Sequence, residues 1–64
     1  MATEFKIEHD GQFYRFTFEV KAGIVTVIGA VGRKSTQLGN TPPETIARML
    51  AGEILREADR DGLL

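Results

Sequence analysis

The segment from Thr26 to Thr36, TVIGAVGRKST, contains residue types that could bind a nucleotide phosphate: glycines, basic side chains and hydroxyl groups. A phosphate-binding loop has the pattern G-x-x-x-x-G-K-[ST] between a strand and a helix, so that backbone N–H groups and the lysine surround the phosphates. Here Gly29 precedes Lys34 by five positions, and Arg33 stands where the second glycine belongs. No helix is expected directly after Lys34. The segment therefore argues against a nucleotide-binding enzyme.

His9, Asp10 and Ser35 supply the residue types of a catalytic triad. In a triad, the carboxylate must orient the imidazole that activates the hydroxyl group. His9 and Asp10 are consecutive in an alternating segment, so we expect their side chains on opposite faces of a strand. We therefore predict no catalytic residue and no enzyme activity, and we interpret His9 as a partly exposed residue at a strand end.

The composition limits metal and cofactor sites. The chain has no cysteine and one histidine, so carboxylates would have to fill most positions of a zinc site. We predict neither a metal nor a cofactor. Domains of about 60 residues bury only about 60% of their unfolded surface and usually need a disulfide, a metal or oligomerisation. Self-association is the stabilising device that remains.

The charge balance also limits the partners. The net charge of -1, from 8 basic and 9 acidic residues, lacks the excess of positive charge typical of nucleic-acid-binding domains. No segment approaches the roughly 20 apolar residues of a membrane span. The first residues show no basic region followed by an apolar one, as a signal peptide would. We expect a soluble cytoplasmic protein that does not contact a membrane.

The elements that position these residues begin with a hairpin. Residues 3–9 and 12–20 alternate between apolar and polar side chains, as half-buried strands do. Asp10-Gly11 between them favours a type I′ turn, whose two central residues have positive φ. This turn places Phe5 opposite Phe16, so the apolar residues of both strands share one face.

A third strand is predicted at residues 24–32, followed by a loop at 33–40. We expect a three-residue connection, 21–23, in which only Gly23 is left-handed. A two-residue connection would force Ala22 to a positive φ, which is costly for alanine.

A helix is predicted at residues 42–60. Thr41 and Glu44 fit a capping box at its start, and Gly62 fits the left-handed residue after its end. The predicted core stripe consists of Ile46, Ala47, Leu50, Ile54 and Ala58. The expected fold is a single α+β domain covering residues 1–64. It consists of a three-stranded antiparallel meander with one C-terminal helix packed on one sheet face.

Gly52 does not fit this helix, because glycine costs about 1 kcal/mol relative to alanine in a helix interior. It lies away from the predicted stripe. The simple interpretation is a tolerated surface glycine, and the alternative is close approach by another chain.

The third predicted strand is apolar on both of its faces. In the expected register, Ile24 and Ile28 face the helix and the valines face outward beside two residues of the second strand. The predicted interface consists of Phe13, Thr17, Val25, Val27 and Val31. A register shift of one residue would exchange the two rows and turn Ile24 and Ile28 outward.

An uncovered apolar face and an edge strand with unpaired N–H and C=O groups both favour association. We predict a homodimer that pairs its third strands or stacks its sheets about a two-fold axis. A different protein partner is the alternative occupant of this surface. The predicted function is a small non-catalytic protein-interaction module.

A second hypothesis is a nucleic-acid-binding domain that uses the outer sheet face. Phe13 would provide an aromatic platform for a base. The predicted phosphate contacts are Lys6, Arg15, Lys21, Arg33 and Lys34. Acidic residues on the same face argue against this hypothesis, because electrostatic affinity needs a positive patch.

Overall fold

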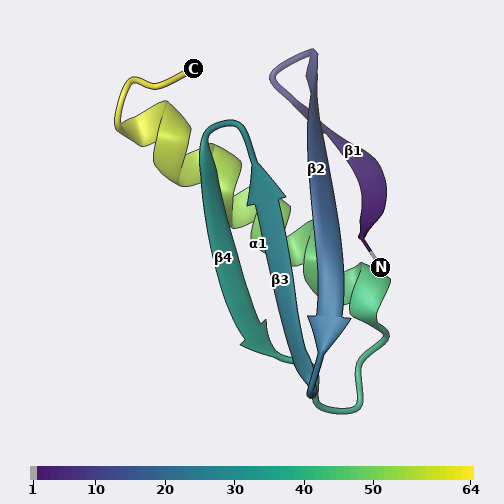
Figure 1. Cartoon of the computed structure of the whole chain (residues 1–64). Coiled ribbons are helices and arrows are strands. Elements are labelled where there is room, and N and C mark those ends of the chain that lie inside the picture. Colours follow the sequence, from purple (N-terminus) through teal and green to yellow (C-terminus); the bar gives the residue numbers. More distant parts are fainter. Residues whose placement is uncertain (1) are drawn as a thin grey trace.

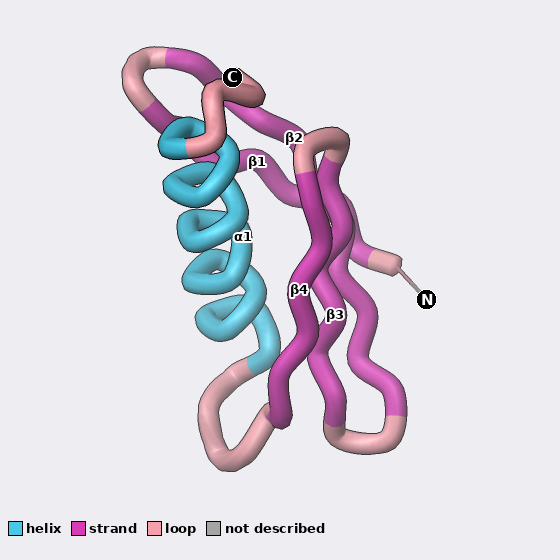
Figure 2. The backbone as a smooth tube through the Cα atoms, turned by 90° about the vertical axis from the view of Figure 1, so that its left-hand side faces the viewer, coloured by secondary structure: helices cyan, strands magenta, loops and turns pink. Residues whose placement is uncertain are grey.

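The computed structural model describes residues 2–64 as an α+β fold in which one helix covers one face of an open antiparallel sheet (Figures 1 and 2). The strand order in the sheet is β1-β2-β3-β4, so consecutive strands are neighbours. The elements are β1 (Thr3–His9), β2 (Gln12–Lys21), β3 (Ile24–Gly29), β4 (Gly32–Gln37) and α1 (Pro43–Arg60). The α+β class and the C-terminal helix agree with the prediction, whereas the predicted number of three strands is wrong.

The hairpin of β1 and β2 has the turn and the register predicted from the sequence. Asp10 and Gly11 have φ values of 52° and 80°, as a type I′ turn requires. Phe5 lies opposite Phe16. The turn chemistry and the alternation of side chains point to the same pairing, which is why the sequence determines it.

The connection from β2 to β3 differs from the expected three-residue loop. It has two residues, and both Ala22 and Gly23 are left-handed, with φ values of 52° and 76°. Val25 consequently lies opposite Val20, one position away from the expected register. This register places Gly29 rather than Ile28 opposite the buried ring of Phe16. The Phe16 ring needs this space beneath the helix. The two-residue connection is therefore favoured over the expected three-residue loop, although it strains Ala22.

A fourth strand occupies most of the segment predicted as the loop 33–40, and the predicted third strand 24–32 ends early at Gly29. Ala30 and Val31 form a turn, and β4 returns beside β3 from Gly32. β4 has few of the β-branched or aromatic residues that favour strands, so its sequence, GRKSTQ, carries little strand signal. Pairing with β3 determines its conformation. As a result, β3 is an interior strand rather than an edge strand.

The helix begins one residue later than predicted. Pro42 is the N-cap residue, with ψ of 139° and no side-chain cap hydrogen bond, so the expected capping box of Thr41 and Glu44 does not form. The reason is Pro43, because a residue before proline is sterically driven out of the helical region. At the other end, Gly62 has a φ of 74° as predicted. Leu63 N–H donates to the Ala58 carbonyl at 2.8 Å, which completes a Schellman motif.

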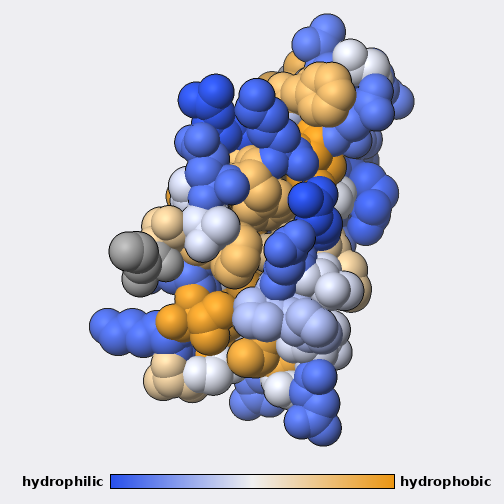
Figure 3. Space-filling model, turned by 90° about the vertical axis from the view of Figure 1, so that its right-hand side faces the viewer, coloured by the Kyte–Doolittle hydropathy of each residue, from blue (hydrophilic) through white to orange (hydrophobic). Residues whose placement is uncertain are grey.

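The core lies between α1 and the inner face of the sheet. The predicted helical stripe is buried, together with the flanking Ala51 and Leu55. The sheet contributes Phe16, Val25 and Val27. Phe5 and Ile7 of β1 are only partly buried, and a band of apolar side chains crosses the side of the molecule on which β1 lies (Figure 3).

Candidate functional site

The face of the sheet opposite the helix is not covered by any element within residues 2–64 (Figures 1 and 2). We define the outer face by the side chains that alternate with the core-facing ones along the four strands. They are Glu4, Lys6 and Glu8 of β1, Phe13, Arg15, Thr17, Glu19 and Lys21 of β2, Ile24, Thr26 and Ile28 of β3, and Arg33, Ser35 and Gln37 of β4.

The apolar part of the outer face is centred on β3. Ile28 is 46% exposed, and Ile24 on the same strand is partly exposed. Thr17 lies directly opposite Ile28 on β2. Phe13 is 71% exposed and lies farther along β2, near the Asp10-Gly11 turn. A contiguous apolar patch on an uncovered face indicates an interaction surface, whereas single exposed apolar side chains are common on monomers.

The structure places the predicted interface residues on two different sides of the sheet. Phe13 and Thr17 are on the outer face, as expected. Val25 and Val27 each have 0% exposure and lie in the core, so their expected outward orientation is wrong. Val31 is in the turn before β4 and packs against the core. The two-residue connection between β2 and β3 causes the exchange, because a shift of one residue moves every side chain of a strand to the other face.

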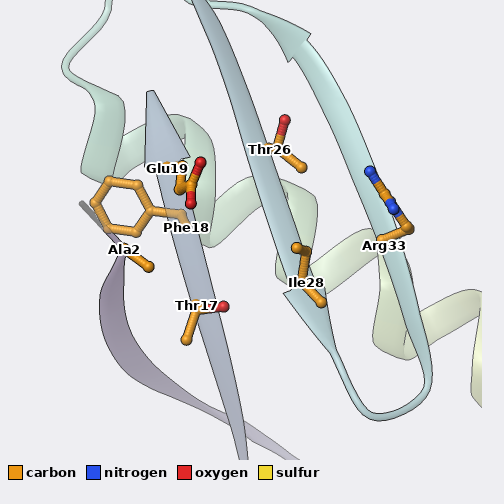
Figure 4. A pocket seen from close by; sticks show the side chains of 7 residues that line it. All are labelled: Ala2, Thr17, Phe18, Glu19, Thr26, Ile28 and Arg33. Carbon is orange, nitrogen blue, oxygen red and sulfur yellow. The ribbon is translucent and has the colours of Figure 1, made fainter. Parts of the chain in front are cut away.

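A shallow hollow of about 200 Å³ lies in the middle of the outer face. Glu19 of β2 and Arg33 of β4 line it from opposite sides, with Thr26 and Ile28 of β3 between them (Figure 4). Neither charged group forms an ion pair within residues 2–64. The Thr26 and Ser35 hydroxyl groups are hydrogen-bonded to each other at 3.0 Å. The hollow thus offers a carboxylate, a guanidinium and an apolar centre, which can bind a complementary surface.

Four of the five predicted nucleic-acid contacts lie on the outer face, namely Lys6, Arg15, Lys21 and Arg33. Acidic residues stand among them, and Arg15 Nε lies 3.7 Å from a carboxylate oxygen of Glu4. The face therefore carries charges of both signs rather than a positive patch.

Lys34, the fifth predicted contact, lies on the opposite side of the sheet. Its Nζ donates to Glu57 at 2.5 Å and to Glu53 at 3.3 Å, so it joins the edge strand β4 to α1. The hydrogen bonds to Glu57 and then Glu53 raise the pKa of Lys34 above its ordinary value. The hydrogen bond from Lys34 lowers the pKa of Glu57. Lys34 therefore has a structural partner and is directed away from the outer face.

His9 lies on the inner face, where its ring joins the hairpin to the end of α1. Its Nε2 is 3.1 Å from an Asp59 oxygen and 3.7 Å from an Asp10 oxygen. The expectation that His9 and Asp10 point to opposite faces is wrong, because the turn at Asp10 ends the strand alternation. Ser35 is on the outer face, hydrogen-bonded to Thr26, so these residues form no triad.

The group of His9, Asp10 and Asp59 is the one set of possible metal ligands found among residues 2–64, and its donor atoms lie within 4.8 Å of one another. The hydrogen bond between His9 and Asp59 gives this group a structural role without an ion. No local pattern in the sequence indicates Asp59, since fifty positions separate it from His9 and the two residues meet only where the hairpin passes over the end of α1.

No helix within residues 2–64 combines the length and the apolar character needed to cross a membrane. Comparisons of the chain with protein-family models, with curated proteins and with solved structures find no match.

Proposed function

We propose that the chain is a small non-catalytic interaction module that binds a second copy of itself through the outer face. One observation carries the proposal: Ile28 is 46% exposed at the centre of a sheet face that α1 does not cover. A two-fold arrangement of stacked sheets would bury Ile28 and Ile24 of both copies. Such burial would supply the additional stability that a domain of about 60 residues usually needs.

The charges of the outer face also favour a second copy as the partner. A surface that carries both signs can be complementary to itself when a two-fold axis brings opposite charges together. Glu19 and Arg33 lie on opposite sides of β3 and have no ion-pair partner within residues 2–64. Stacking about an axis along β3 brings Glu19 of one copy towards Arg33 of the other.

The expected pairing of third strands does not belong to this proposal. β3 is hydrogen-bonded to β2 on one side and to β4 on the other, so it has no free edge to offer. Association through β3 can therefore use only its outward side chains, and it takes the form of stacked sheet faces.

Sedimentation equilibrium of an Ile28→Lys variant tests the proposal. A lysine at the centre of the stacked faces would place like charges against each other, so we expect the variant to have a lower solution mass than the wild type. Leu64→Lys is the matched control, because Leu64 is 44% exposed and lies outside the sheet. Equal masses for Ile28→Lys and the wild type would contradict the proposal.

Nucleic-acid binding is the second candidate, favoured by the presence of Phe13 and four basic residues on the outer face. Single substitutions separate this function from a structural effect. Arg33→Ala should weaken binding of a labelled mixed-sequence oligonucleotide, whereas Lys34→Ala should not, because Lys34 is directed towards α1. If the wild-type protein causes no salt-dependent change in the fluorescence anisotropy of the labelled oligonucleotide, nucleic-acid binding is excluded.

A further inference from the structure

The sheet has two free edges, β1 and β4, because β2 and β3 are interior strands. In an antiparallel pair, alternate residues direct their N–H and C=O groups towards the partner strand. Leu38 N–H donates to the Gly23 carbonyl at 2.8 Å. In this register the N–H and C=O groups of the even-numbered residues of β4 therefore point towards β3. The backbone groups of Arg33, Ser35 and Gln37 therefore point outward along the free edge of β4.

The side chains at the β4 edge leave it open to another strand. Natural proteins often protect an edge strand with an inward-pointing lysine. Lys34 occupies such a position, but Glu53 and Glu57 hold its ammonium group against α1. The central residue with outward backbone groups is Ser35, which is small and uncharged.

The β1 edge is better protected against pairing with itself. The two-residue turn makes His9 and Gln12 the hydrogen-bonded pair that closes the hairpin, so the odd-numbered residues of β1 direct their backbone groups towards β2. The outward backbone groups therefore belong to Glu4, Lys6 and Glu8. A two-fold pairing that uses all three residues would place Lys6 opposite Lys6 and Glu4 opposite Glu8. Like charges directly opposite each other destabilise a strand pair.

We infer that β4 pairs antiparallel with β4 of a second copy, about a two-fold axis at Ser35, to form a continuous sheet twice the width of the four-stranded one. This inference rests on the proposed self-association and adds a second surface to it. In this register Ser35 lies opposite Ser35 of the second copy, and Arg33 lies opposite Gln37. All outward N–H and C=O groups of the strand are then paired.

The neighbouring registers are less favourable. Centring the axis on Lys34 would place two lysines opposite each other, which is destabilising. Centring it on Thr36 would pair Arg33 with Gly39, a left-handed residue beyond the end of the strand. Charge and strand length thus select the register centred on Ser35.

A groove beside the β4 edge supports the same arrangement. It has a volume of about 450 Å³ between β4 and α1, and its apolar lining includes Leu38, Ile46, Met49 and Leu50. Met49 is 59% exposed, although it is a large apolar side chain. Pairing of the two β4 strands places the helix of the second copy on the same side of the sheet. The exposed methionines of both copies then face the seam between the helices.

Cysteine cross-linking tests this pairing, because the chain contains no cysteine. Residues opposite each other in a hydrogen-bonded antiparallel pair have Cα atoms about 5.5 Å apart, a distance that a disulfide spans. We expect Ser35→Cys to form a disulfide-linked dimer under mild oxidation. Arg33→Cys should remain unlinked, because the two copies of residue 33 are about 13 Å apart in this register. A mixture of Arg33→Cys and Gln37→Cys should form a mixed disulfide.

A proline variant provides a second readout that needs no oxidation. Ser35→Pro removes an outward N–H group, which an edge strand tolerates when no partner is present. We expect it to lower the solution mass while far-ultraviolet circular dichroism remains that of the wild type. Equal cross-linking of Ser35→Cys and Arg33→Cys, or an unchanged mass for a folded Ser35→Pro, would overturn the edge pairing.

The outcomes separate this inference from the proposed function. Ile28→Lys removes only the stacking of outer faces, and Ser35→Pro removes only the pairing of edges. If both surfaces are used, the wild type has a mass above that of a dimer, and each variant is a dimer. A wild type that sediments as a monomer at all concentrations would contradict both. A dimer that Ile28→Lys dissociates and Ser35→Pro leaves intact would contradict only the edge pairing.

Discussion

Gly29 lies directly opposite Phe16 in the sheet, and the Phe16 ring occupies the space that a side chain at position 29 would need. A Cβ atom on Gly29 would lie 2.4 Å from Cε1 of Phe16, which is far inside van der Waals contact. We therefore expect Gly29→Ala to destabilise the fold by about 1–3 kcal/mol, the usual cost of overpacking a core. Urea denaturation followed by circular dichroism measures this change. Gly32→Ala is a milder control, because its Cβ would meet only Ile54 Cγ2 at 3.1 Å.

For Gly52 we expect the opposite effect, because no contact within residues 2–64 requires a glycine there. A Cβ atom at this position would meet only the Arg56 guanidinium, at 3.4 Å. Gly52→Ala should stabilise the fold by about 1 kcal/mol through helix propensity. The measurement is the midpoint of thermal unfolding together with the solution mass. A loss of mass with unchanged or higher stability would show that another chain approaches the helix at Gly52.

Ala22 carries the strain of the connection between β2 and β3. Its φ of 52° is in the left-handed region, where a residue with a Cβ atom loses about 1–2 kcal/mol. Ala22→Gly should therefore raise the free energy of unfolding by about 1 kcal/mol, since part of the gain is lost to the larger entropy of the unfolded chain. Chemical denaturation measures this change, with Ala30→Gly as the control. Ala30 lies in a turn but has no positive φ, so Ala30→Gly should destabilise the fold. A destabilised Ala22→Gly would contradict the described turn.

The sequence determines the elements whose local signals agree with one another. Asp10-Gly11 and the alternation on both sides of it lead to one register, and the helical stripe agrees with the glycine signal at Gly62. The third strand lacked such agreement, because both of its faces are apolar and either register buries a hydrophobic row. The space beside Phe16 decides between them, and that space exists only in the assembled core.

The candidate site was predictable only in part for the same reason. Phe13 and Thr17 lie in the well-determined hairpin and were placed correctly on the outer face. In the observed register Val25 and Val27 face the core and Ile24 and Ile28 face outward, which is the reverse of the predicted arrangement. Contacts between distant segments had no local signal. Lys34 reaches Glu53 and Glu57 because β4 is a strand that places it beside α1, and the sequence of β4 carries little strand signal.

The contact between Lys34 and Glu57 should make stability depend on pH at both extremes. The pKa of Glu57 is lowered in the folded state, so its contribution is present above the ordinary value of 4.5 and is lost as pH falls through the folded pKa. The pKa of Lys34 is raised, so its contribution is present below 10.5 and is lost as pH rises through the folded pKa.

Lys34→Met tests this pH dependence, since it removes the ammonium group and keeps a long apolar side chain. We expect the variant to be less stable than the wild type at neutral pH and the difference to shrink below pH 4.5. Urea midpoints at neutral and acidic pH give the comparison. A difference that stays constant across this range would show that the loss comes from packing rather than from the ion pair.

The solution mass of the wild-type chain tests self-association most directly. Light scattering and sedimentation equilibrium at micromolar concentrations should give a mass of at least twice the 7.1 kDa of one chain, falling towards that value on dilution. A mass of one chain at every concentration, with a well-folded spectrum, would show that the outer face with Ile28 and Phe13 remains in water and would contradict the account.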